Sequence, residues 1–221
     1  MANDKLLLNS RPVAPLGVVP LKSCEDIGKR VDNWLISWRS ERDEERTSKE
    51  EEPVYDNGSY LVEIDNPRFG SGEAKGEIKR TVRGLDLYLM VDITNHSLFY
   101  DIYGEPNHMS PDDHFQDLKR IIAAVEGKAH RITVIMPFLY EGRQHRRSAR
   151  ESLDCALALQ ELVNMGVDNI ITFDAHDPRV QNAIPLHGFE TVKCTYQFIK
   201  GICKYVDDIK FDNDHLMVIS P

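Results

Sequence analysis

The sequence lacks the features of a membrane or secreted protein. Among its 221 residues no apolar run approaches the roughly 20 residues that a helix needs to cross a bilayer, which excludes a transmembrane helix. The first ten residues hold only a short leucine run at positions 6–8, so no secretory signal is expected. The four cysteines form no CxxC pair. We therefore expect reduced thiols and a cytoplasmic location.

The sequence also lacks an excess of basic residues and the common phosphate-binding motifs. Lys and Arg number 27 against 36 Asp and Glu, which gives a net charge of -9. This balance argues against a general nucleic-acid binder, although it leaves room for a local basic site. Neither a GxGxxG nor a Walker A sequence is present. The length fits one large domain, or one domain and part of a second.

Apolar segments of strand length alternate with amphipathic segments of helical length. Near-continuous apolar strands alternating with helices indicate an α/β fold, with a parallel sheet flanked by helices. In such folds ligands bind beyond the carboxyl ends of the strands. The spacing predicts strands at 14–19, 60–64, 87–91, 132–136, 170–173 and 216–219, helices at 23–38, 111–126, 152–165 and 195–206, and irregular structure at 94–110.

The first predicted helix carries an apolar stripe and leads into an acidic run. The stripe, at helical spacing, consists of Ile27, Val31, Trp34, Leu35 and Trp38. The run at 41–52 is rich in glutamate and is closed by proline, which indicates a solvated helix end or a loop.

An arginine cluster follows the predicted strand at 132–136. Residues 137–150 contain four arginines within eight positions, although the protein is acidic. Arginine binds phosphate oxygens through two parallel hydrogen bonds, so this loop suggests a polyphosphate or nucleotide site. The alternative is a solvated basic loop that pairs with the acidic run at 41–52. The arginines are Arg143, Arg146, Arg147 and Arg150.

Two further segments offer groups that suit a nucleotide. Asp174-Ala175-His176 follows the predicted strand at 170–173, where a carboxylate and an imidazole can hold Mg²⁺ or can cap the next turn. In the glycine-rich segment 68–73, adenine could stack on Phe69 and bond to Ser71 or Glu73. A hairpin turn explains that composition equally well.

These segments together resemble the ribose-phosphate pyrophosphokinases, also called phosphoribosyl pyrophosphate synthetases. The family's Pro-x-x-x-Tyr-x-Arg-Gln stretch is similar to 137–144, and its Ile-Ile-Thr-x-Asp-x-His is similar to 170–176. Its Phe-x-(Asp/Asn)-x-Glu loop and the following Val-Arg-Gly resemble 69–73 and 82–84. Its Val-Ser-Pro-Asp-x-Gly-Gly loop is similar, in its first part, to 218–221.

The resemblance implies a reaction and a set of binding residues. The family transfers the diphosphoryl group of ATP to ribose 5-phosphate, giving phosphoribosyl pyrophosphate and AMP. It assembles as dimers that form hexamers, so a homo-oligomer is implied. By position, Arg143 and Gln144 would contact ATP, and His176 would help to hold Mg²⁺ on its phosphates. The adenine would be held by Phe69, Ser71 and Glu73, in the family from a neighbouring subunit.

The resemblance also divides the chain. It implies an ATP-side domain of the phosphoribosyltransferase-like type at 1–192, with an acidic insertion at about 41–53. Residues 193–221 would begin a second, similar domain, whose ribose 5-phosphate and catalytic segments lie beyond residue 221 in the family. We therefore expect no catalytic residue within this chain and no activity of the chain alone. The alternative is a non-catalytic, synthetase-like protein that binds nucleotide or regulates a complete enzyme, which the departures from the family pattern at Ser71 and Glu151 favour.

Overall fold

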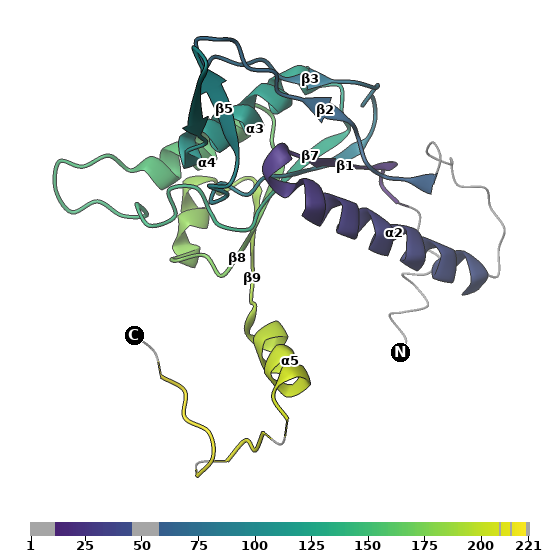
Figure 1. Ribbon diagram of the computed structural model, residues 1–221, viewed down its shortest axis with the longest axis vertical. Helices are drawn as coiled ribbons and strands as arrows, with labels where there is room; N and C mark the ends of the chain where they lie inside the picture. Colours follow the sequence, from purple (N-terminus) through teal and green to yellow (C-terminus); the bar gives the residue numbers. More distant parts are fainter. Residues whose placement is uncertain (1–11, 46–57, 208, 213, 220–221) are drawn as a thin grey trace.

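Five parallel strands form the central sheet of the computed structural model, which describes residues 12–45, 58–207, 209–212 and 214–219 (Figure 1). The α/β class with a parallel sheet is confirmed. The predicted strands at 14–19, 87–91, 132–136 and 170–173 are all present within a few residues. Across the sheet the strands are β1 (Leu16–Pro20), β4 (Asp86–Met90), β7 (Arg131–Met136), β8 (Asn169–Phe173) and β9 (Gly188–Val192).

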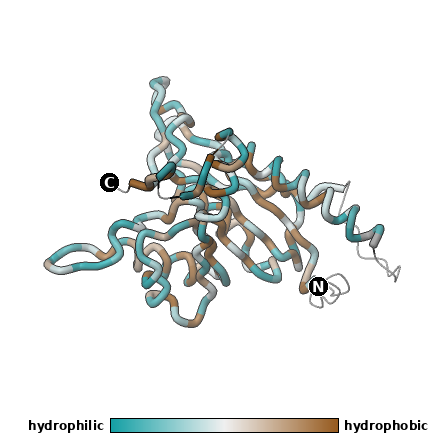
Figure 2. Tube along the Cα trace, turned by 90° about the horizontal axis from the view of Figure 1, so that it is seen from below, coloured by the Kyte–Doolittle hydropathy of each residue, from teal (hydrophilic) through white to brown (hydrophobic). Residues whose placement is uncertain are grey.

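Alternate residues of the strands divide the core between the two faces of the sheet. Val19, Leu89 and Val134 are fully buried in the larger core cluster, together with apolar residues of α3 (Pro111–Val125) and α4 (Asp154–Asn164). Their neighbours Val18 and Met90 belong to a smaller cluster on the other face, against α2 (Glu25–Glu45). Because side chains alternate along a strand, each face of the sheet carries apolar residues that pack against helices. Figure 2 shows hydrophobic stretches of the chain meeting in the middle of the molecule.

The helix predicted from residue 111 begins and ends at clear signals. Ser110 caps α3 with its hydroxyl, and the Asp113 carboxylate accepts a hydrogen bond from the Ser110 backbone in return. This capping box satisfies backbone N–H groups that the first turn leaves without partners. At the other end Glu126 adopts the left-handed region, with φ of 53°. The cap thus fixes the start of α3, whose first turns contact the loops described in the next subsection.

The structure corrects the prediction of irregular structure at 94–110. Two strands, β5 (Phe99–Ile102) and β6 (Glu105–His108), pair there as an antiparallel hairpin. Its two-residue tip is Tyr103-Gly104, with φ of 51° and 89°. The two positive φ angles match a primed hairpin turn. Asn-Gly is the usual pair in such a turn, so Tyr-Gly is a weak indication of a hairpin.

Other differences lie at the edges of the sheet. The predicted strand at 60–64 contributes one bridge from Leu61 to β1, and a short β2 (Ile64–Asp65) that pairs with β3 (Glu77–Ile78). The edge strand β9 was not predicted. The strand predicted at 216–219 does not form, and Met217, Val218 and Ile219 are at least 80% exposed.

The C-terminal helix α5 (Thr195–Tyr205) was predicted and stands below the sheet (Figure 1). It contains no buried residue. The proposed division of the chain at 192/193 stays a prediction. Most of the acidic run at 41–53 lies outside the described residues, whereas positions 41–45 form the end of α2. No helix in the described part of the chain combines the length and the apolar character needed to cross a membrane.

Candidate functional site

The loops that follow β7 and β8 meet at the carboxyl edge of the sheet. The rings of His145 and His176 lie 5.1 Å apart between centroids, and His145 Nε2 lies 3.6 Å from the Asp177 carboxylate. Because parallel neighbours end at the same edge, the arginine motif and the Asp-x-His motif become adjacent. His176 is exposed, whereas the side chains of His145 and Asp177 are 15% and 12% exposed.

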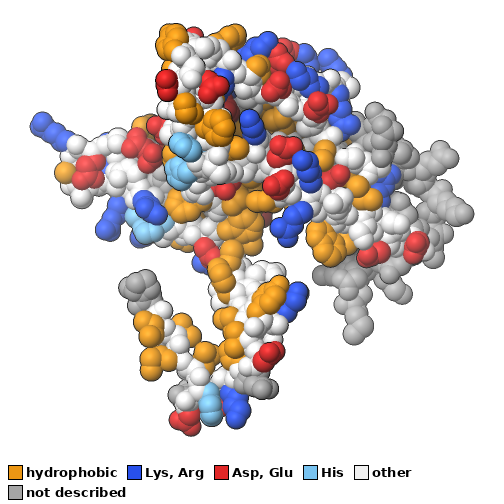
Figure 3. All heavy atoms as spheres, in the orientation of Figure 1, with side chains coloured by type: hydrophobic (Ala, Val, Ile, Leu, Met, Phe, Trp, Pro, Cys, Tyr) orange, Lys and Arg blue, Asp and Glu red, His pale blue; other side chains and the backbone are white. Residues whose placement is uncertain are grey.

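Arginines occupy the loop between β7 and α4, which projects from the side of the molecule (Figure 3). All four are exposed, and none of them forms an ion pair with a described residue. The Arg143 guanidinium lies 5.6 Å from the centroid of the Phe138 ring, which orients it by a cation–π contact. The loop therefore presents unneutralised positive charge beside His176.

Gln144 closes the base of this loop. Its amide nitrogen donates to the Ser152 carbonyl at 2.8 Å, and its backbone carbonyl accepts from the Cys155 amide at 3.4 Å. The side chain thus holds the two ends of the loop together. Its expected contact with ATP stays a prediction.

The three residues expected to hold adenine lie on a tight turn. The Phe69 amide donates to the Glu73 carbonyl at 2.7 Å, and the Ser71 hydroxyl donates to the Glu73 carboxylate at 2.9 Å. Phe69 is 53% exposed. A bridge between Arg68 and Ala74 makes the segment hairpin-like, so the turn and the exposed aromatic face coexist.

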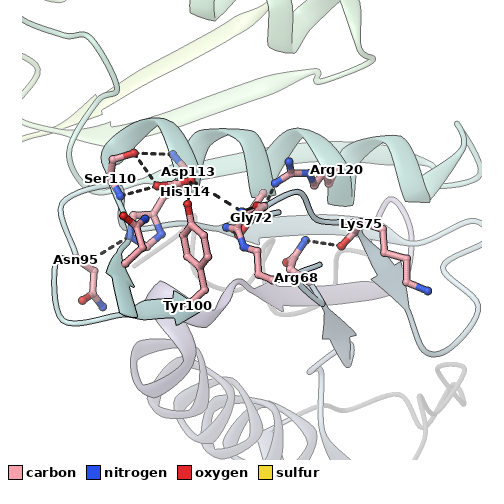
Figure 4. A network of polar contacts seen from close by, with 12 residues as sticks. Arg68, Gly72, Lys75, Asn95, Tyr100, Ser110, Asp113, His114 and Arg120 are labelled. Carbon is pink, nitrogen blue, oxygen red and sulfur yellow. Dashed lines mark hydrogen bonds and ion pairs between the residues drawn. The ribbon is translucent and has the colours of Figure 1, made fainter. Parts of the chain in front are cut away.

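Arg68 anchors this turn to α3, a role that the sequence did not indicate (Figure 4). Its guanidinium lies 2.7 Å from the Asp117 carboxylate and 4.3 Å from the centroid of the Tyr100 ring. Asp117 also binds Arg120 at 2.6 Å, and the Tyr100 hydroxyl donates to Asp113 at 3.1 Å. Arg68 and Asp117 are 49 residues apart, so no local spacing could reveal the pair.

Burial sets the electrostatics of this anchor. The side chains of Arg68 and Asp117 are 12% and 9% exposed. Desolvation raises the pKa of Asp117 even though two guanidinium groups oppose the shift. Burial and the charge of Asp113 likewise raise the pKa of Tyr100. The anchor is therefore a desolvated ionic network and not a solvated surface pair.

Tyr140 ties the second loop to the same helix. Its hydroxyl donates to Asp112 at 2.7 Å, and its ring stacks on Phe115 at 4.2 Å between centroids, with 9° between the planes. Burial, together with the hydrogen bond to Asp112, raises the pKa of Tyr140. One end of α3 thus supports both candidate loops.

The six expected ligands fall into two separate groups. His176 lies near the loop of Arg143 and Gln144, as the topology requires. No hydrogen bond, ion pair or ring contact within the described chain joins Phe69, Ser71 or Glu73 to Arg143, Gln144 or His176.

The residues at this edge can supply part of a metal site. No group of three His, Cys, Asp or Glu side chains in the described ranges could enclose an ion. Asp174 accepts from the Cys194 amide at 3.1 Å, and Asp177 is bound by Arg179. Arg179 also holds the pKa of Asp177 well below its usual range. His176 remains as an exposed side chain that can coordinate a metal ion, which fits an ion bound mainly by the phosphates of a substrate.

Comparisons with a family model and with individual proteins point to the same family. The sequence model described as the N-terminal domain of ribose phosphate pyrophosphokinase matches residues 17–166. The ribose-phosphate pyrophosphokinase of Parasynechococcus marenigrum (strain WH8102) is 28% identical over 170 residues, which cover 74% of this chain and 45% of that protein. Ribose-phosphate pyrophosphokinase B of Dictyostelium discoideum is 27% identical over 158 residues, covering 70% of this chain and 43% of that protein.

The fold agrees with a solved structure. The crystal structure of phosphoribosylpyrophosphate synthetase from Mycobacterium smegmatis superposes with a TM-score of 0.64 at 16% identity, covering 86% of this chain and 52% of that one. The chain spans about half the length of the relatives that it matches. With the family's N-terminal domain matched across most of the central sheet, the chain belongs to the ribose-phosphate pyrophosphokinase family.

Proposed function

We propose that this chain supplies the MgATP-binding half of a ribose-phosphate diphosphokinase, which gives phosphoribosyl pyrophosphate and AMP. The observation that carries the proposal is the exposed arginine loop at the carboxyl edge of the sheet. Its arginines form no ion pair with a described residue, and its His145 lies against His176. A polyphosphate matches that charge, whereas the net charge of -9 disfavours a nucleic acid.

The residues have simple roles in this proposal. Diphosphoryl transfer depends mainly on positioning and on neutralising phosphate charge, which arginines and a metal ion provide. Arg143 binds phosphate oxygens, and Gln144 shapes the loop that presents it. Phe69 offers a face on which adenine stacks, with Ser71 and Glu73 as hydrogen-bonding partners from a neighbouring subunit of a homo-oligomer.

Magnesium enters as an ion on the ATP phosphates, with His176 as the protein donor. When bound, it neutralises phosphate charge. Hydrated Mg²⁺ usually takes only one or two protein ligands in such sites, in agreement with the small donor set at this edge.

Calorimetry with MgATP tests the binding half of the proposal. We expect Arg143→Ala to weaken binding about tenfold or more, because a charge-assisted bond to phosphate is lost. His176→Ala should weaken binding of MgATP more than of metal-free ATP. Lys29→Ala on α2 is the matched control, since it removes an exposed positive charge from another part of the molecule. Equal loss in the control, or no binding by the parent chain, would refute the assignment.

The transfer reaction forms a separate test. We propose that the chain alone binds MgATP without transferring its diphosphoryl group to ribose 5-phosphate. Robust AMP release from this chain with both substrates would contradict this part of the proposal and leave the binding site in place.

A non-catalytic, regulatory role is the second candidate. It is favoured by the bond of Ser71 to Glu73 and by the bond of Gln144 to Ser152, which occupy groups expected to reach ATP. Mixing the chain with a complete synthetase separates the candidates. Co-assembly without MgATP binding would favour regulation, and MgATP binding without co-assembly would favour the first proposal.

A further inference from the structure

Helix α2 leaves part of its apolar stripe outside the core. Val31 and Leu35 pack against the sheet, as the stripe predicts. Ile27, Trp34 and Trp38, however, are 43%, 59% and 57% exposed. The two indoles contact each other, with centroids 5.9 Å apart. Exposed tryptophan is costly in a monomer and common at protein interfaces.

The exposed stripe runs along one line of the helix. Ile27, Trp34 and Trp38 follow the spacing i, i+7, i+11, which places them within about 40° of one another on a helix of 3.6 residues per turn. Figure 1 shows that α2 lies at the side of the sheet and extends away from it. The stripe is therefore a continuous surface, available to a second helix.

Charges beside this stripe have a self-complementary arrangement. Arg30 precedes the tryptophan pair and Glu41 follows it, and both are exposed. Eleven residues separate them, so they lie on the same flank of the stripe. Glu41 accepts only a 3.2 Å hydrogen bond from Ser37, and no ion pair in the described chain involves Arg30.

An antiparallel pair of α2 helices uses this arrangement twice. With a two-fold axis midway between Trp34 and Trp38, each Trp34 lies at the level of the partner's Trp38. Arg30 then lies within one residue's rise, about 1.5 Å, of the level of the partner's Glu41. An antiparallel two-fold brings the same flanks together, whereas a parallel pair would oppose different flanks. The pattern of positive charge, two tryptophans and negative charge therefore complements itself.

We propose that the exposed stripe of α2 is a self-association surface, on which a second copy of this chain docks in antiparallel orientation. Tryptophan offers up to roughly 250 Å², so four indoles exposed to this extent bury about 500–600 Å². Stable interfaces begin near 1,200 Å², so this contact belongs among the weak, reversible ones.

The chain's own tryptophans provide the readout. The sequence contains two, and both lie in the stripe, so tryptophan emission reports on this surface without a label. We expect the emission to move to shorter wavelength as protein concentration rises, in step with dimer formation measured by sedimentation. A protein that stays monomeric, with emission independent of concentration, would overturn the proposal. That result would hold both for a stripe exposed to solvent and for a stripe that binds a different protein.

Substitutions distinguish this surface from any other contact. Trp38→Ala should weaken dimerisation more than about tenfold, because central tryptophans dominate interfaces and alanine preserves the helix. Leu157→Ala, which trims an exposed apolar residue of α4, is the control. A dimer that survives Trp38→Ala unchanged would overturn the proposal.

The charges test the antiparallel orientation. Arg30→Glu should weaken the dimer about tenfold, since two symmetric pairs each contribute up to about fivefold. Adding Glu41→Arg to that variant should restore association. Lys29→Glu makes the same change of charge on another face of α2 and should leave the dimer unchanged. Failure of the double exchange to restore association would refute the orientation.

Discussion

The anchor at Arg68 gives a quantitative prediction about a buried ion pair. Replacing Arg68 by Met leaves Asp117 as a desolvated carboxylate with Arg120 as its remaining partner. Removing one member of a buried pair typically costs 3–5 kcal/mol. Since Arg120 stays in place, we expect a loss of about 2–3 kcal/mol in the free energy of unfolding. With a urea m-value of roughly 2 kcal/mol per molar, the urea midpoint falls by about 1 M.

A matched pair elsewhere isolates the effect of burial. Arg179 lies 2.6 Å from Asp177, but its side chain is 79% exposed. Arg179→Met should therefore leave the urea midpoint unchanged within error. An equal effect of the two substitutions would refute the argument from desolvation.

The same substitution predicts a pH dependence. Without Arg68, the folded-state pKa of Asp117 rises further above its usual 3.8. When a carboxyl group has a higher pKa in the folded protein than in the unfolded chain, its ionisation lowers the free energy of unfolding, because the unfolded chain ionises more easily. The deficit of Arg68→Met should therefore be full at neutral pH and shrink as the pH falls through the raised pKa. A deficit that is constant across this range would contradict the assignment to Asp117.

Three further predictions follow from backbone and burial. Tyr103→Asn should raise the free energy of unfolding by about 1 kcal/mol in urea titrations, because asparagine tolerates the left-handed φ of 51° better than tyrosine; a loss of stability would refute this. Gly28→Ala should lower it by about 1–3 kcal/mol, because the added Cβ would lie 2.4 Å from Pro20, and thermal unfolding checks this. Burial, and to a smaller extent the charge of Asp92, raises the pKa of Cys24 from 9.0 to about 12. Between these two pH values the thiol is ionised in the unfolded chain but not in the folded protein, so the free energy of unfolding should fall as the pH rises. Cys24→Ser should flatten that fall in chemical denaturation, and an unchanged profile would argue against the assignment.

The central sheet was predictable because its strands carry strong local signals. Residues 132–136 are apolar except for Thr133, and most of them are buried in the interior, where both faces of the sheet are covered. The edge strand β9 mixes glycine, glutamate and threonine and is half-exposed, so its sequence lacks such a run. The apolar run at 216–219 shows the opposite failure. Hydrophobicity alone does not make a strand, since residues 216–219 pair with no strand in the described part of the chain.

The candidate site was predictable only where the order of the strands in the sheet determines which loops lie side by side. Placing loops after β7 and β8 at one edge brings His145 to His176, and strand order is enough to foresee this. The anchor of Arg68 on Asp117 depends on a long-range pairing that periodicity does not encode. The exposed half of the α2 stripe was missed because periodicity identifies an apolar face without showing how wide its contact with the sheet is.

The first turns of α3 have a consequence for how the molecule opens. Asp112 and Phe115 hold the loop with Tyr140, while Asp113 and Asp117 hold Tyr100 and Arg68. Both loops thus share one rigid support, and neither can detach without disturbing the same helical turns. In hydrogen exchange the amides of the two loops should open as one cooperative unit, with a common opening free energy. Two segments more than 60 positions apart would then behave as a single folding element.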